Sequence, residues 1–145
     1  GLRDAGTPVR LMLSLEMIGY FSDAPGSQRY PVKGLSAVYG DRGDFLALIA
    51  PFSASDMQLT RRVKALAQGA TQLPVRSLNA PAFVPGVDFS DHRNYWALGM
   101  PALMVTDTSF MRNPHYHLAS DTPDTLDYVR MAEVVKAVYA VVVAH

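Results

Sequence analysis

Four short apolar runs constrain the fold of this chain more than any other feature of its sequence. They cover residues 9–16, 45–50, 73–78 and 101–106, and turn-forming or polar residues bound each of them. Runs of this length that are rich in Val, Leu, Ile and Met are typical of strands that a parallel or mixed sheet buries on both faces. The first run ends on a carboxylate, Glu16, which we expect at the carboxyl end of its strand.

Helical signals lie between and after these runs. Ser53, followed three residues later by Asp56, is a capping signal for a helix that Gly69 ends. A brief helix is expected through residues 95–98, and a last helix after Asp127. Apolar residues recur at helical spacing in two of these helices: Leu59, Val63, Leu66 and Ala67 in the first, and Tyr128, Met131, Val135, Val138 and Val142 in the last. Alternation of strands and helices predicts an α/β fold, with a mostly parallel or mixed central sheet flanked by helices.

Composition limits the class of protein further. With 145 residues, of which 49% are hydrophobic and 18% charged, the chain is expected to form a single domain over residues 1–145. Thirteen basic and thirteen acidic residues cancel, so neither nucleic acid nor an anionic membrane surface is an expected partner. No apolar stretch approaches the ~20 residues of a membrane-spanning helix. Without cysteine, any metal site must use His, Asp or Glu.

Three polar clusters follow or precede the predicted strands. They are Glu16, the group at residues 90–92, and the turn-rich segment 107–127, which holds two histidines and several aspartates. Ligands of α/β sheets bind outside the carboxyl ends of the strands, so we expect these clusters to meet in space. The long irregular segment 20–44 is expected to border the same site.

Imidazole and carboxylate groups in these clusters suit zinc. If extended, the chain would point His115 and His117 to one side and Tyr116 to the other; a hydrogen-bonded loop with surface histidines is the alternative. Asp121, four residues after His117, could orient that imidazole, and Asp91 could either support the site or cap the next helix. Residues 124 and 125 are candidate caps of the last helix. Serine catalysis is not expected, because residues 90–92 are consecutive and no Gly-x-Ser-x-Gly elbow occurs.

Three motifs carry a resemblance to a known family: LEMIGY at 15–20, SDHRNYW at 90–96 and DTSFMRNPHYHLASDTPDTLDY at 107–128. In this order, they resemble the zinc aminopeptidases with two co-catalytic metals, a family that includes bacterial leucyl aminopeptidases and whose fold the glutaminyl cyclases share. The resemblance implies that Glu16 and His117 are metal ligands, Glu16 standing where the family usually has Asp. It further implies that Tyr116 contacts the oxyanion, and that Asp91 and Asp121 occupy supporting positions. His115 matches no family ligand.

The chain departs from this family before Glu16. The family's remaining metal ligands and its general-base glutamate precede the motif that contains Glu16, whereas here only fifteen residues precede it and none is His or Glu. The chain therefore resembles the carboxyl-terminal part of a zinc peptidase catalytic domain that is incomplete at its amino terminus. We expect little or no activity from it alone. We also expect an exposed sheet edge that recruits a partner, either the missing amino-terminal half or a second copy in a homodimer.

The function implied is hydrolysis of amino-terminal residues of peptides by a parent protein with two zinc ions. This chain would supply part of the site and share in binding the peptide substrate. Two alternatives stay open. One is an acyltransferase of the glutaminyl cyclase type, and the other is a non-catalytic module for binding or assembly. The sequence indicates no compartment.

Overall fold

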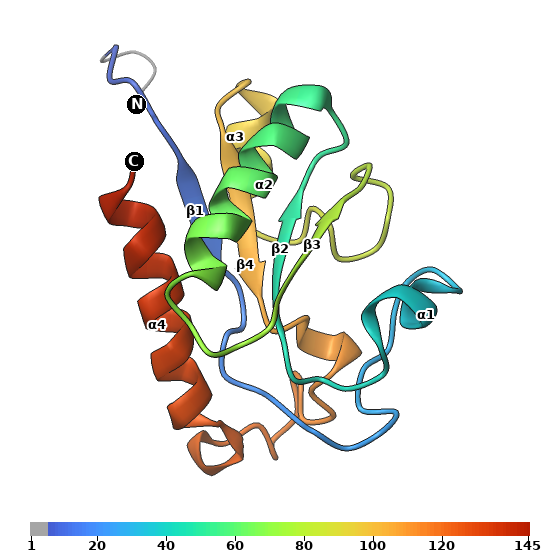
Figure 1. The fold of residues 1–145 in the computed structure, drawn as a ribbon. Coiled ribbons are helices and arrows are strands. Elements are labelled where there is room, and N and C mark those ends of the chain that lie inside the picture. The colour runs from blue at the N-terminus through green and yellow to red at the C-terminus, as the bar shows by residue number, and fades with distance from the viewer. Residues whose placement is uncertain (1–5) are drawn as a thin grey trace.

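A computed structural model describes residues 6–145 of the chain, and its strands and helices alternate as the sequence predicts (Figure 1). The strands are β1 (Met12–Leu15), β2 (Leu46–Ala50), β3 (Val75–Asn79) and β4 (Ala102–Thr106). The α-helices are α1 (Leu35–Tyr39), α2 (Ala54–Gln68), α3 (His92–Ala97) and α4 (Tyr128–Val143), and 3-10 turns cover Ser109–Met111 and Pro123–Thr125. Of these, α1 is an element that the sequence analysis did not predict.

The described strands form one mixed sheet in the order β1-β4-β2-β3. Strand β1 runs parallel to β4 and β2 runs parallel to β3, while β2 and β4 are antiparallel. The carboxyl ends of β1 and β4 therefore meet the amino ends of β2 and β3 at one edge of the sheet. This arrangement confirms the predicted α/β fold with a mixed sheet and helices around it.

Strand β1 differs from the sequence prediction in its burial. The apolar run at 9–16 suggested a strand covered on both faces, but β1 is an edge strand and its Leu15 is 49% exposed. By contrast, every residue of the inner strands β2 and β4 is buried. An apolar run indicates a strand, but it does not show whether that strand lies inside the sheet or at its edge.

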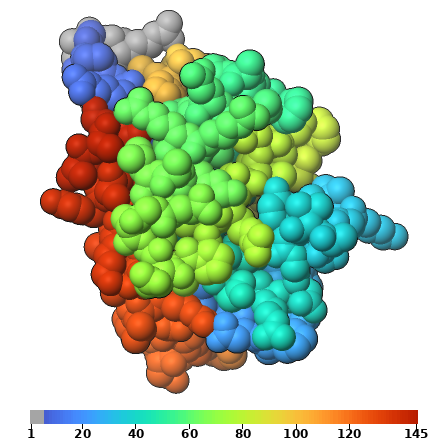
Figure 2. All heavy atoms as spheres, in the orientation of Figure 1, coloured from blue at the N-terminus to red at the C-terminus, as the bar shows by residue number. Residues whose placement is uncertain are grey.

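Helices α2 and α4 lie side by side over one face of the sheet (Figure 1), and their green and red atoms adjoin on the surface in Figure 2. Ser53 caps α2 by accepting a hydrogen bond from the amide of Asp56, and Val63 and Ala67 of the predicted stripe are buried. In α4 the predicted stripe is correct only in part, since Val138 packs against the core. The buried residues are Val134, Ala137 and Val141, while Tyr128, Val135 and Val142 are exposed. The principal core forms between these helices and the side chains of Leu46, Leu48, Leu103 and Val105.

The other face of the sheet carries the second apolar cluster, which includes Phe45, Ala47, Ile49 and Met104. Helix α3 and the irregular segment 20–44 cover this face only in part, and they leave a cavity above the strands. Within residues 6–145, no helix is long and apolar enough to cross a lipid bilayer.

Candidate functional site

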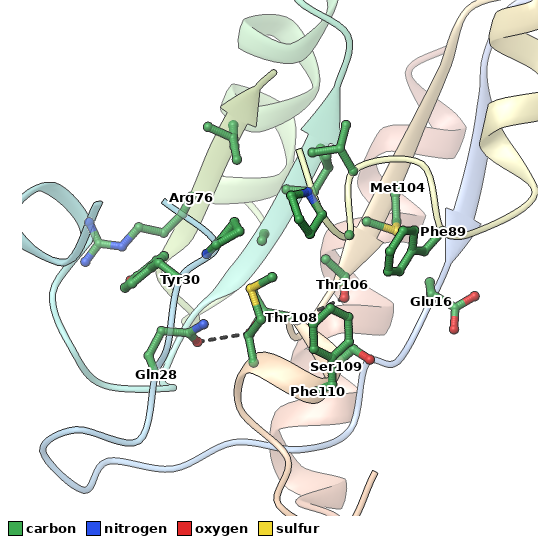
Figure 3. A pocket seen from close by; sticks show the side chains of 18 of the residues that line it. Glu16, Gln28, Tyr30, Arg76, Phe89, Met104, Thr106, Thr108, Ser109 and Phe110 are labelled. Carbon is green, nitrogen blue, oxygen red and sulfur yellow. Dashed lines mark hydrogen bonds between the residues drawn. The ribbon is translucent and has the colours of Figure 1, made fainter. Parts of the chain in front are cut away.

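The candidate site is an open cavity of about 100 Å³ on the sheet face that α2 and α4 leave free (Figure 3). It extends from the carboxyl ends of β1 and β4 to strand β3. Glu16 and Tyr116, two of the predicted site residues, both line it. The prediction that segment 20–44 borders the site is confirmed by the lining residues Gln28, Tyr30, Pro31, Leu35 and Tyr39.

Glu16 is held by hydrogen bonds at both its backbone and its carboxylate. Its amide donates to the carbonyl of Val105 at 3.0 Å, which extends the pairing of β1 with β4 by one residue. The hydroxyl of Ser90 donates to Glu16 Oε2 at 2.7 Å and also lies 2.7 Å from the hydroxyl of Ser14. Because the single proton of Ser90 goes to Glu16, Ser14 is the donor of the second bond. These two hydrogen bonds, from Ser14 to Ser90 and from Ser90 to Glu16, fix the carboxylate. The sequence analysis did not predict them.

Asp107, directly after β4, ties the loop that follows β1 to the loop that follows β4. Its carboxylate is 2% exposed and accepts hydrogen bonds from the amides of Gly19, Tyr20 and Ser109 at 2.9, 2.7 and 2.8 Å. Burial raises the pKa of Asp107, while these amides and the nearby Arg112 act in the opposite direction. Asp107 thus organises the backbone next to Glu16, and it does not line the cavity.

Arg112 joins the segment 20–44 to the loop after β4. Its Nε donates to Gln28 Oε1 at 2.9 Å, and its guanidinium lies over the ring of Phe45 at 4.7 Å from the centroid. Burial lowers the pKa of Arg112 to about 10. Gly43 leaves the space for this side chain, since a Cβ atom there would lie 2.6 Å from Arg112 Cδ.

Tyr116 and His117 lie in a turn, so the extended arrangement considered for residues 115–117 is wrong. The amide of Leu118 donates to the carbonyl of His115 at 2.9 Å, and His117 has a positive φ of 59°. As a result, the rings of Tyr116 and His117 stack, with centroids 3.9 Å apart and an interplanar angle of 15°. Phe110 packs on Tyr116 at 5.8 Å. Tyr116 borders the cavity, while His117 is exposed and is not among the lining residues.

Asp121, predicted as a supporting residue, is exposed and contacts a neighbour other than His117. Its Oδ1 accepts a hydrogen bond from Asn113 Nδ2 at 3.4 Å, while His115 Nδ1 lies 3.0 Å from the hydroxyl of Ser120. The Asn113 side chain also accepts from the amide of His115 at 2.8 Å. Asp121 is therefore linked to the tyrosine-histidine turn through Asn113.

Asp91 stands at the amino end of α3 but does not cap it with its side chain, so the capping alternative is wrong. Its carboxylate is exposed, and its neighbour Ser90 is the residue that contacts Glu16. The cap expected at residues 124 and 125 is also wrong. Asp127 caps α4 by accepting from the amide of Arg130, because residues 123–125 form a separate 3-10 turn.

His92, the last residue of the 90–92 cluster, belongs to the core. It is fully buried, its Nε2 lies 2.8 Å from the carbonyl of Val87, and its ring meets Trp96 edge to face at 4.4 Å. Burial lowers the pKa of His92, and the Val87 carbonyl opposes this effect. These contacts give His92 a structural role beneath the site.

The carboxylate of Glu16 and the imidazole of His117 are suitable donors for zinc, but they are too few. A catalytic zinc site uses three protein ligands in addition to water. Within residues 6–145, no group of three His, Asp or Glu side chains is arranged to hold a metal ion. The described residues therefore do not complete a zinc site by themselves.

Comparison with known proteins adds a sequence relative and several solved structures. The chain is 52% identical over 131 residues to the uncharacterized protein YfbL of Escherichia coli strain K12, an alignment that covers 90% of this chain and 40% of YfbL. No protein-family model matches the chain. The chain thus spans about two fifths of the length of this relative.

The similar solved structures include the LapA aminopeptidase and LapB of Legionella pneumophila. A crystal structure of the LapA aminopeptidase matches with a TM-score of 0.66 and 22% identity, over 97% of this chain and 32% of that chain. LapB matches with a TM-score of 0.68 and 21% identity, over 98% of this chain and 32% of that chain. The α/β fold predicted from the sequence is therefore an aminopeptidase-like fold, and the chain spans about one third of these structures.

Proposed function

We propose that this chain forms part of the active site of an aminopeptidase within a longer parent protein. The observation that carries the proposal is the convergence of Glu16 and Tyr116 on one apolar cavity at the strand ends. The aminopeptidase-like fold supports it. In this proposal the cavity walls take up an apolar group of a peptide substrate, and the polar residues at its mouth face the bond to be cleaved.

Tyr116 is proposed to donate its phenolic proton to the oxyanion that develops on the scissile carbonyl. Its ring is packed between Phe110 and His117, which limits the orientations of the hydroxyl before substrate binds. Asp121 is proposed to support this turn through Asn113. Asp91 is proposed to support the opposite side, next to the serine that fixes Glu16.

Zinc is the proposed cofactor, on the strength of the family resemblance and of the donor types. Glu16 and His117 would each contribute one ligand, and bound zinc would supply Lewis-acid chemistry. The other ligands and the general base would come from residues outside 6–145 of this chain. The isolated chain is accordingly expected to have little or no peptidase activity.

The test is hydrolysis of leucyl p-nitroanilide by the parent protein and by its Tyr116→Phe variant. Loss of one oxyanion donor should lower kcat by about 100- to 1000-fold, with a smaller effect on KM. Tyr128→Phe is the matched control, because Tyr128 is an exposed residue of α4 on the other face of the sheet. Absence of hydrolysis by the parent protein, or full activity of Tyr116→Phe, would contradict the proposal.

The cyclase alternative is separated by the same assay with a glutaminyl peptide. A cyclase needs a pocket that holds an amino-terminal glutamine, whereas the walls of this cavity are apolar and include Ile49, Met104 and Phe89. Formation of pyroglutamyl product in place of hydrolysis would favour the cyclase. A parent protein that processes neither substrate would favour the non-catalytic module.

A further inference from the structure

The end of the cavity farthest from Glu16 is lined by an arginine. Figure 3 shows Glu16 and Arg76 on opposite sides of the cavity, with Met104, Thr106 and Phe110 between them. Arg76 belongs to β3, where it pairs in register with Ala47 of β2. Its neighbour Val75 packs into the principal core on the opposite face of the sheet, so strand alternation turns Arg76 toward the cavity.

The guanidinium of Arg76 has unused hydrogen-bond donors. Its Nε is buried and makes no hydrogen bond, and no carboxylate within residues 6–145 forms an ion pair with it. Its Cζ lies over the Phe45 ring at 5.6 Å from the centroid. The hydroxyls of Tyr30 and Tyr39 donate to the carbonyls of Gly40 and Ser77, so these two phenol protons are already engaged.

An unpaired buried donor on a charged side chain is costly, and the cost is removed when an anionic acceptor binds. Arg112 in the same region also has one buried nitrogen without a hydrogen bond, Nη2, but its other two nitrogens donate to Gln28 Oε1 and to the carbonyl of Tyr20. Both guanidinium groups lie over the Phe45 ring. Only Arg76 lines the cavity.

The walls between the two ends are apolar and limit the size of a ligand. They include Ala47, Ile49, Val87, Phe89 and Met104. A cavity of about 100 Å³ that is open on one side accepts a short chain of about the size of benzene, since an engineered apolar cavity of about 150 Å³ binds benzene. A ligand that fits must therefore combine a short apolar segment with an acceptor group for Arg76.

We propose that this cavity binds a short aliphatic chain that ends in a carboxylate, with the carboxylate paired to the Arg76 guanidinium. The inference deepens the proposed function and, as a statement about substrate, rests on it. In the proposed enzyme, the carboxylate belongs to a part of the substrate remote from the reacting bond, because the reacting end lies at Glu16 and Tyr116.

The test is direct binding to this chain of three probes of equal chain length: hexanoate, hexan-1-ol and hexylamine, followed by NMR titration. Wild-type protein should bind hexanoate most tightly, with shifts at residues that line the cavity. Arg76→Met should weaken hexanoate binding by about 10- to 100-fold and leave hexan-1-ol binding unchanged. Arg76→Lys, which keeps the charge but loses the planar fork, should give an intermediate affinity.

Arg61→Met is the matched control, since Arg61 is an exposed residue of α2 on the opposite face of the sheet and its loss changes the net charge equally. The amide spectra of all variants report whether they are folded. Equal hexanoate affinity in folded wild type and Arg76→Met, or wild-type binding of hexan-1-ol or hexylamine as tight as that of hexanoate, would overturn the inference.

Binding requires neither metal nor turnover, so the two proposals fail separately. A chain that binds hexanoate through Arg76 and belongs to an inactive parent protein would contradict only the proposed function. An active parent protein whose cavity does not distinguish hexanoate from hexan-1-ol would contradict only the inference about Arg76.

Discussion

Replacing Asp107 with Asn should destabilise the fold and loosen the loop next to Glu16. Asp107 Oδ2 accepts the amides of Gly19 and Tyr20, and its Oδ1 accepts the amide of Ser109. An Asn side chain has one acceptor oxygen, so it can keep the first two bonds only by turning its NH₂ group toward Ser109. One hydrogen bond is lost and one buried donor is left unpaired, which together cost about 2–4 kcal/mol.

A second effect acts in the opposite direction and sets the pH dependence. Burial raises the pKa of Asp107 above its ordinary value of 3.8, so ionising this carboxyl in the folded state costs free energy that Asn does not incur. The Asp107 contribution is therefore fully present below pH 3.8 and declines as pH rises through the folded-state pKa. Asp107→Asn should lower the free energy of unfolding by less at pH 7 than at pH 3.8. At pH 7 the loss should lie near the lower end of the range given above.

Urea denaturation followed by circular dichroism measures the free energy of unfolding, and amide hydrogen exchange at Ser109 gives the local readout. The exchange rate at Ser109 should increase more than the global change in stability explains. Asp91→Asn is the control, because Asp91 is exposed and its substitution should change stability by less than about 0.5 kcal/mol. A stability of Asp107→Asn equal to that of wild type at pH 3.8 and pH 7, with unchanged Ser109 exchange, would refute the reasoning.

Three further predictions concern packing, pH and association. Gly43→Ala should cost about 1–3 kcal/mol in urea denaturation, because the new Cβ would lie 2.6 Å from Arg112 Cδ; a neutral effect would show that Arg112 can move freely. Burial lowers the pKa of His92 below 6.5, so wild-type stability should be fully present above pH 6.5 and fall as pH decreases, and His92→Gln should reduce this slope. An unchanged slope in His92→Gln would contradict that assignment. On α4, Val135 and Tyr139 are exposed, so the isolated chain should self-associate in sedimentation experiments and Tyr139→Glu should weaken association; a wild-type chain that stays monomeric at high concentration would contradict it.

The sequence predicted the layers of the fold because burial leaves a strong pattern in the inner elements. All residues of β2 are buried, and its apolar run stands out between Gly43 and the capping residue Ser53. The α2 stripe was also correct, since polar residues separate its apolar positions and leave only one possible buried face. Both elements are specified by local residue patterns, which a sequence displays directly.

The buried face of α4 could not be predicted, for a related reason. Its sequence, YVRMAEVVKAVYAVVV, is apolar on several sides, so helical spacing fits more than one stripe. The predicted stripe contained Val135, which is 62% exposed, whereas the neighbouring Val134 is fully buried. Contacts with α2 and the sheet select the buried face, and a sequence does not show which side those neighbours occupy.

For the site, the sequence predicted that Glu16 and Tyr116 would lie close together. It did not predict that His117, Asp91 and Asp121 lie outside the cavity, nor which contacts hold the site. Because β1 and β4 are parallel neighbours, their carboxyl ends lie at the same end of the sheet, and this brings Glu16 and Tyr116 to one cavity. The bonds that fix this geometry join residues 74 and 88 positions apart, Ser90 with Glu16 and Gly19 with Asp107. Since these partners come from separate loops, any chemistry at Glu16 depends on all three segments being folded together. Loss of stability and loss of function should therefore be coupled at this end of the sheet.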